Sequence, residues 1–267
     1  MPDAKAAART ASNSPILRGL ARLGFAVNGL LHALIGLIAI GIAVGTGSGE
    51  ADQSGALTQL ASAPGGAFVL WVVVVGLAAL GLWLILGAFL FRAPDPKKRV
   101  SHIVKEVAKG LVYLAVAGTA LTFAQGGTSN SASSASQASA GLLSTPGGQI
   151  LAVVIGVAIA AIGVYFVVKG VTKKFTDDIS VPAGPAGTAT VFVGVLGYVA
   201  KGVVLVLVGV LFAVAAFAVD PGKATGIDGA LRTLATLPLG MALLWIVGAG
   251  LIAYGVYCGV RALRARL

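Results

Sequence analysis

The residues most able to do chemistry are six polar side chains inside long apolar stretches: Asn28, His32, Glu106, Lys109, Tyr113 and Lys201. A polar side chain in a membrane span costs free energy and therefore marks a functional candidate. Asn28, Lys109 and Lys201 occupy one position of an internal repeat, directly before a glycine. If the repeats surround an axis, these three residues form a polar ring, and its two lysines would attract an anion or a lipid headgroup.

The competing interpretation is that these side chains lie at the membrane edge and reach water. About 22–27 Å of helix separates Asn28, Lys109 and Lys201 from the loops that follow them, whereas the hydrocarbon is about 30 Å thick. The long side chains could then snorkel to the headgroups. His32 lies one helical turn after Asn28, and Tyr113 takes the same place in the second repeat. We expect His32 to be an interhelical hydrogen-bond partner.

Motifs of catalysis and metal binding are absent from the sequence. His32 and His102 are the two histidines, and no HExxH pattern occurs. The single cysteine, Cys258, excludes an internal disulfide and a cysteine-rich metal site. Glu106 lies three residues before Lys109 and is expected to pair with it, so no carboxylate in a span is left for a proton relay. We therefore predict a protein with no enzymatic activity, no cofactor and no metal.

Six apolar stretches position these side chains. Of the 267 residues, 57% are hydrophobic and 10% are charged, whereas soluble domains carry about 25% charged residues. A membrane-spanning helix needs about 20 apolar residues. Suitable stretches lie near residues 23–45, 67–91, 107–124, 149–168, 191–219 and 239–260. The sequence therefore predicts an all-α membrane protein with six transmembrane helices.

Lysine and arginine gather at alternate ends of the spans. The two tails and the segments 92–105 and 169–174 are basic. The opposite loops hold two basic residues, Lys223 and Arg232, balanced by Glu50, Asp52, Asp220 and Asp228. Basic loops stay in the cytoplasm, so we predict that both termini are cytoplasmic. Because the net charge of +10 is divided among the span ends, it does not indicate nucleic-acid binding.

Two sets of markers reveal three tandem copies of a two-helix unit. The first is the polar residue and glycine at 28–29, 109–110 and 201–202, and the second is a proline before each even-numbered span: Pro64, Pro146 and Pro238. The glycines are 81 and 92 residues apart, and the prolines are 82 and 92 residues apart. We assign repeat one to residues 16–92, repeat two to 99–174 and repeat three to 188–267, after a disordered cytoplasmic tail at 1–15.

The repeats carry further expectations about packing. Successive repeats enter the membrane in the same direction, which predicts a pseudo-threefold axis along the membrane normal. The glycines that follow each proline by 17 residues are Gly81, Gly163 and Gly255. They are expected to let helices approach closely, and the three prolines are expected in the first helical turn of the even spans. Short helices are expected at the GAL segments 55–57 and 229–231, and a flexible loop at the polar segment 128–139.

The repeat pattern resembles a known family. It is clearest in the third repeat, which reads GYVAKG at 197–202 and GALRTLATLPLG at 229–240. Over residues 18–261 the chain resembles the bacterial three-repeat membrane proteins of domain of unknown function twelve-oh-six. The resemblance implies six helices and a bacterial inner membrane, and it brings no activity or site residues. Asn28 stands where a basic residue is usual, so a site of three equivalent cations would here have two.

We therefore predict an integral inner-membrane protein that is not an enzyme and acts through helix packing, lipid contacts or a partner. The expected partners are the lipid bilayer, with anionic phospholipid as the candidate lipid, and a membrane protein or a second copy of the chain. Nucleic acid is not expected. The alternative is a small-solute or ion permease with the polar ring at the cytoplasmic end of the helices.

Overall fold

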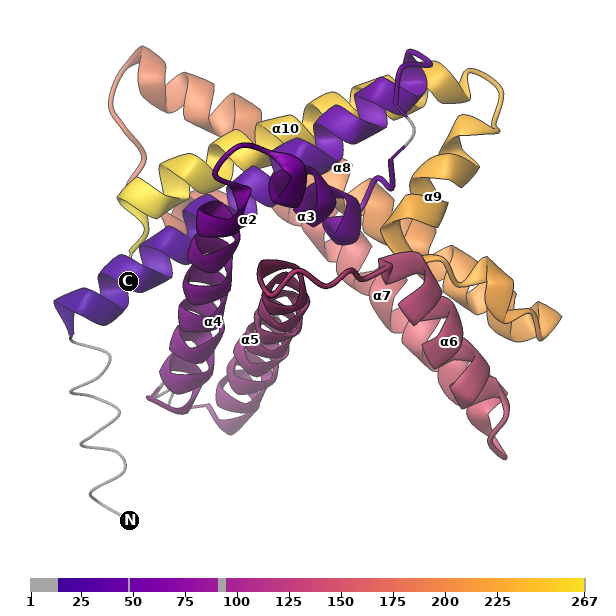
Figure 1. Ribbon diagram of the computed structural model, residues 1–267. Helices are drawn as coiled ribbons and strands as arrows, with labels where there is room; N and C mark the ends of the chain where they lie inside the picture. The colour runs from indigo at the N-terminus through magenta and orange to yellow at the C-terminus, as the bar shows by residue number, and fades with distance from the viewer. Residues whose placement is uncertain (1–13, 48, 91–94, 267) are drawn as a thin grey trace. The chain divides into compact units, whose positions relative to one another are not determined.

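Six long helices dominate the computed structural model, which describes residues 14–47, 49–90 and 95–266. They are α2 (Pro15–Ala43), α4 (Gly66–Leu90), α5 (Pro96–Ala124), α7 (Gly148–Val171), α8 (Pro185–Ala218) and α10 (Gly240–Arg264) (Figure 1). All six are long and apolar enough to cross a membrane. No β-strand occurs in the described ranges. The predicted all-α, six-helix membrane protein is confirmed, while the predicted tail at 1–15 lies, except for its last two residues, outside the described residues.

In each repeat one short helix connects the two spans. These helices are α3 (Gln53–Ser62), α6 (Ser131–Leu143) and α9 (Gly226–Ala235). We call them the connecting helices. The expected short helices at the GAL segments are α3 and α9. The expected flexible loop at 128–139 was wrong, because α6 occupies most of it. The Asn130 side chain caps α6 by accepting from the Ser133 amide at 2.6 Å, and interspersed alanines favour the helix. Two 3₁₀ turns, η1 (Lys174–Asp178) and η2 (Pro221–Lys223), are the remaining elements of the described residues.

Each repeat proline lies in a turn before the helix and not in the helix itself. The three prolines are Pro64, Pro146 and Pro238. In repeat one the Gly66 amide donates to the Ala63 carbonyl at 2.8 Å, and α4 begins only after that turn. The residue after each proline has a positive φ, which is +74° at Gly65 and +60° at Leu239. Proline at the second position and positive φ at the third are typical of a type II turn. This corrects the expectation that the prolines lie in the first helical turn.

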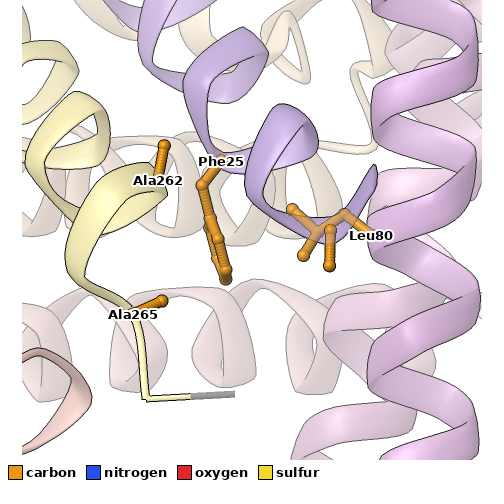
Figure 2. Close-up of a cluster of buried hydrophobic side chains, with 5 residues drawn as sticks. Phe25, Leu80, Ala262 and Ala265 are labelled. Atoms are coloured by element: carbon orange, nitrogen blue, oxygen red, sulfur yellow. The ribbon is translucent and has the colours of Figure 1, made fainter. Parts of the chain in front are cut away.

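The chain forms two compact units, and unit 1 contains residues up to 28, 59–128 and 258 onward. Within it α4 and α5 lie side by side (Figure 1). Their contact is a glycine pair, since a Cβ added to Gly110 would lie 2.7 Å from the Gly81 carbonyl oxygen. Phe25 and Leu80 are buried beside Ala262 (Figure 2). These contacts make a small apolar core at one end of α2 and α10.

Unit 2 contains residues 29–58 and 129–257. Here α7 packs along α8, where a Cβ on Gly163 would lie 2.7 Å from the Gly202 oxygen. The remainder of α10 packs along α2, where a Cβ on Gly255 would lie 2.6 Å from the Gly29 oxygen. Such close backbone approach replaces the hydrophobic driving force that helices lack in lipid.

The three glycine pairs follow one rule of repeat order. The pairs are Gly81 with Gly110, Gly163 with Gly202, and Gly255 with Gly29. In each pair the second span of one repeat packs against the first span of the next, and repeat three packs against repeat one. The pairing order along the chain is therefore cyclic, and the pseudo-threefold axis stays a prediction.

Candidate functional site

Asn28, the first member of the predicted polar ring, lies in unit 1 and is 6% exposed. Its Nδ2 donates to the Cys258 Sγ at 3.4 Å, a bond that links α2 to α10. Cys258 is itself buried. The pair joins the first repeat to the last.

Lys109, also in unit 1, pairs with Glu106 on its own helix. The Lys109 Nζ lies 2.6 Å from the Glu106 Oε1, and the lysine side chain is 49% exposed. The expected pairing of these two residues is confirmed. Tyr113, one turn further along α5, packs against the apolar core that contains Phe25 and Leu80.

Lys201 lies in unit 2 among aromatic rings. Its Nζ donates to the Tyr254 hydroxyl at 3.3 Å and lies 4.3 Å from the centroid of the Tyr254 ring and 5.3 Å from that of Phe166. A cation over an aromatic face is stabilised by the ring quadrupole. The His32 ring contacts the same tyrosine, with centroids 4.8 Å apart. The structure thus brings His32 and Lys201 together on Tyr254, while a shared ring of Asn28, Lys109 and Lys201 stays a prediction.

An aromatic cluster that sequence reasoning missed continues from Tyr254. The Tyr198 ring lies 5.1 Å from Phe175 and 5.4 Å from both Tyr254 and Tyr257. The Tyr257 hydroxyl donates to the Phe175 carbonyl at 3.0 Å. The signal for this cluster was the i, i+3 spacing of Tyr254 and Tyr257, which places both rings on one helix face. The cluster anchors η1, the segment after α7, to α8 and α10.

A second feature that the sequence did not reveal joins the connecting helices. We call it the carboxylate cluster, and it consists of Glu50, Asp52, Asp228, Arg232 and Asn130. All five residues belong to unit 2. From the sequence alone, its charged residues were interpreted only as loop residues whose charges balance one another.

Asp228 of α9 is the centre of the carboxylate cluster and is 7% exposed. Its Oδ1 accepts from the Ala51 amide at 2.8 Å, and its Oδ2 accepts from the Arg232 Nε at 2.7 Å. Arg232 also donates through Nη2 to the Gly49 carbonyl at 3.1 Å. Glu50 accepts from the Asn130 side-chain amide. The cluster therefore ties the loop before α3 to both α6 and α9.

Asp52 caps α3 and is 1% exposed. Its Oδ1 accepts from the Gly55 amide at 3.1 Å, as an N-cap aspartate does. Its buried Oδ2 has no hydrogen-bond partner among the described residues. Burial raises the pKa of Asp52 from 3.8 to about 6, the nearby carboxylates of Glu50 and Asp228 add to the rise, and hydrogen bonds from the Gly55 and Ser54 amides oppose it. Burial, together with Asp228, also raises the pKa of Glu50, against the opposing effect of Arg232.

The connecting helices also bond in cyclic order. The residues ten positions before the prolines are Ser54, Ser136 and Asp228. Ser54 bonds to the Ser131 hydroxyl at 2.6 Å, Ser136 donates to the Pro221 carbonyl at 3.0 Å, and Asp228 accepts from the Ala51 amide. Each therefore reaches a residue at, or a few positions before, the start of the connecting helix of the next repeat. The junction of repeat three with repeat one uses a carboxylate where the other two use a hydroxyl.

A shallow groove of about 670 Å³ lies at the opposite, basic end of unit 2. Apolar residues that include Val181, Pro182 and Phe192 line it, together with Lys173. The groove runs along the first turns of α8, whose amino end carries a partial positive charge. No cluster of three or more potential metal ligands occurs in the described part of the chain.

The chain matches the family described as Domain of Unknown Function (DUF1206) three times, over residues 23–90, 104–173 and 196–265. The chain belongs to this family. It is also similar to the uncharacterised protein YxxB of Bacillus subtilis (strain 168), with 30% identity over 251 residues that cover 91% of this chain and 89% of that protein. No solved structure matches the chain.

The three DUF1206 matches agree with the repeats. They fall inside the predicted ranges 16–92, 99–174 and 188–267, and each contains one connecting helix and both glycines of its repeat. The carboxylate cluster draws on all three matched segments. It is therefore a feature of the assembled repeats and not of a single one.

Proposed function

We propose that the protein is a non-enzymatic scaffold of the plasma membrane, with both termini in the cytoplasm, that acts through lipid or partner contacts. The observation that carries this proposal is the cyclic set of glycine pairs, supported by local pairing of the polar residues in the spans. Asn28 is bonded to Cys258, Lys109 to Glu106, and Lys201 to Tyr254. A hydrolase would need a nucleophile beside a base, and the thiol of Cys258 is instead buried against an amide.

The lipid contact that we favour is with an anionic phospholipid in the groove at the start of α8. The Lys173 ammonium would face the phosphate, and the apolar wall of Val181, Pro182 and Phe192 would face the acyl chains. Phe192 is 64% exposed, which suits a side chain directed at lipid. A basic site at a cytoplasmic helix end attracts an anionic headgroup by about 1 kcal/mol per lysine.

Orientation and lipid preference can be tested on the full chain. A reporter fused after Leu267 should read as cytoplasmic, and an external signal would overturn the topology. In native mass spectrometry, phosphatidylglycerol should remain bound more often than phosphatidylcholine, and Lys173→Glu should remove the difference. The control is Lys98→Glu, which changes the same charge outside the groove. Equal retention of the two lipids would overturn the lipid contact.

The second candidate function is a small-solute or ion permease. It is favoured by Lys201, a half-buried cation held between two aromatic rings inside a span, together with the repeated architecture. Flux in proteoliposomes distinguishes the two functions. A scaffold should leave the vesicles sealed, whereas transport that is lost in the double variant Lys109→Leu, Lys201→Leu would establish the permease.

A further inference from the structure

The junction between repeats three and one is chemically different from the other two junctions. Ser54 and Ser136 bridge their repeats with neutral hydroxyls, while Asp228 bridges with a carboxylate. This junction joins the two ends of the tandem array, because Ala51 belongs to the first repeat and Asp228 to the last. Ionisable groups are thus concentrated where the repeat order closes.

The charges at this junction do not balance. Three carboxylates, from Glu50, Asp52 and Asp228, share one guanidinium, that of Arg232. The guanidinium bonds to Asp228 and to a backbone carbonyl, and Glu50 receives a neutral amide from Asn130. Asp220 and Lys223, which precede α9 in the chain, form a charged pair of their own. It is weak, because the Lys223 Nζ lies 3.9 Å from the Asp220 Oδ2. The unbalanced negative charge favours uptake of a proton.

Asp52 is the group best placed to hold that proton. Its side chain is buried, and its Oδ2 has no hydrogen-bond partner within the described ranges. An ionised oxygen in that position is costly, whereas a protonated one removes the repulsion from Glu50 and Asp228. Protonation leaves Oδ1 free to keep its bond with the Gly55 amide and so preserves the start of α3.

We propose that the carboxylate cluster is a proton-binding latch, which holds the first and last repeats together when Asp52 is protonated and loosens when Asp52 ionises. The latch goes beyond the scaffold function, and either can fail without the other. The raised pKa values of Asp52 and Glu50 support it. Because the closed junction binds the proton more tightly than the open one, closure is most stable in acid. It weakens as the pH rises from 3.8 toward 6 and changes little above about 7.

Hydrogen–deuterium exchange of the full chain in lipid nanodiscs tests the latch, after correction for the intrinsic pH dependence of exchange. The opening constant of residues 49–58 should rise about tenfold between pH 5 and pH 8, which follows from a pKa shift from 3.8 to about 6. The amides of η2, at the hydroxyl junction bridged by Ser136, should show little change and serve as the internal reference.

Substitution identifies the group. Asp52→Asn keeps the acceptor for the Gly55 amide and removes the titration, so protection of residues 49–58 should become the same at both pH values. Asp95→Asn changes another N-cap aspartate, which accepts from the Lys97 amide at 2.9 Å, and should leave the pH dependence intact. The latch is overturned if the natural chain shows equal protection at pH 5 and pH 8, or if Asp52→Asn keeps the full pH dependence.

Discussion

Gly163 of α7 and Gly202 of α8 approach so closely that neither position has room for a methyl group. A Cβ on Gly163 would lie 2.7 Å from the Gly202 oxygen, and a Cβ on Gly202 would lie 2.6 Å from the Gly163 oxygen. The contact is between backbones, so no side-chain rotation relieves it. The same relationship recurs between Gly81 and Gly110.

Gly202→Ala should therefore destabilise the protein although alanine is the better helix former. Overpacking of this kind costs about 1–3 kcal/mol, which exceeds the gain of about 1 kcal/mol from helix propensity. The matched control is Gly118→Ala in α5, because a Cβ at Gly118 meets nothing within 4 Å. Thermal unfolding in mild detergent should show a lower midpoint for Gly202→Ala and an equal or higher midpoint for Gly118→Ala. An unchanged midpoint for Gly202→Ala would contradict the close contact.

Arg232→Met should lower the stability of unit 2. The change removes the bonds from Arg232 to Asp228 and to the Gly49 carbonyl and leaves a buried carboxylate without its cation. Because Arg232 is half-exposed, the expected loss is about 1–2 kcal/mol. Denaturant unfolding at pH 7 measures the loss, and Lys223→Met, which removes one partner of an exposed pair, should cost less.

A double-mutant cycle shows whether that loss comes from the pair. Combining Arg232→Met with Asp228→Asn should cost less than the sum of the two single changes, by about 0.5–3 kcal/mol. Additive losses would mean that the two side chains do not interact in the folded protein.

Leu239→Gly should stabilise the turn before α10. Leu239 has a φ of +60° and is 82% exposed, so its side chain contributes little packing while its backbone is strained. Relief of the left-handed strain, less the added freedom of glycine in the unfolded chain, predicts a gain of about 0.5–1 kcal/mol. The reverse change in repeat two, Gly147→Leu, should destabilise, since Gly147 has a φ of +77°. Unfolding midpoints measure both, and a loss for Leu239→Gly would mean that its side chain is needed.

Cys258 should resist maleimide labelling in the folded protein, because it is 1% exposed and bonded to Asn28. As the single cysteine of the chain, it makes labelling a direct report of the α2–α10 contact. Asn28→Ala should accelerate labelling before unfolding, since it removes the amide that covers the thiol. Rapid labelling of the natural chain without denaturant would place Cys258 at the surface.

The sequence was sufficient for the number of spans, the repeats and the positions of the glycines. These depend on local properties, since hydrophobic length decides what crosses lipid and a repeated glycine marks a repeated need for close approach. Sequence reasoning failed at Pro64, which begins a turn, and at 128–139, where α6 forms. The residue after Pro64 has a positive φ that suits a turn rather than a helix, and α6 has a capping side chain at Asn130 together with a bond from Ser131 to Ser54 of another repeat.

Residue types alone determined that Gly81, Gly163 and Gly255 are suited to close contact, and that the polar residues of the spans are few. Only the tertiary structure decided that each of these glycines meets the next repeat, and that Glu50, Asp52, Asp228 and Arg232 meet at one junction. The physical reason is range along the chain. Hydropathy acts over one helix, whereas Ala51 and Asp228 are separated by 177 residues and come together only when the last repeat closes on the first.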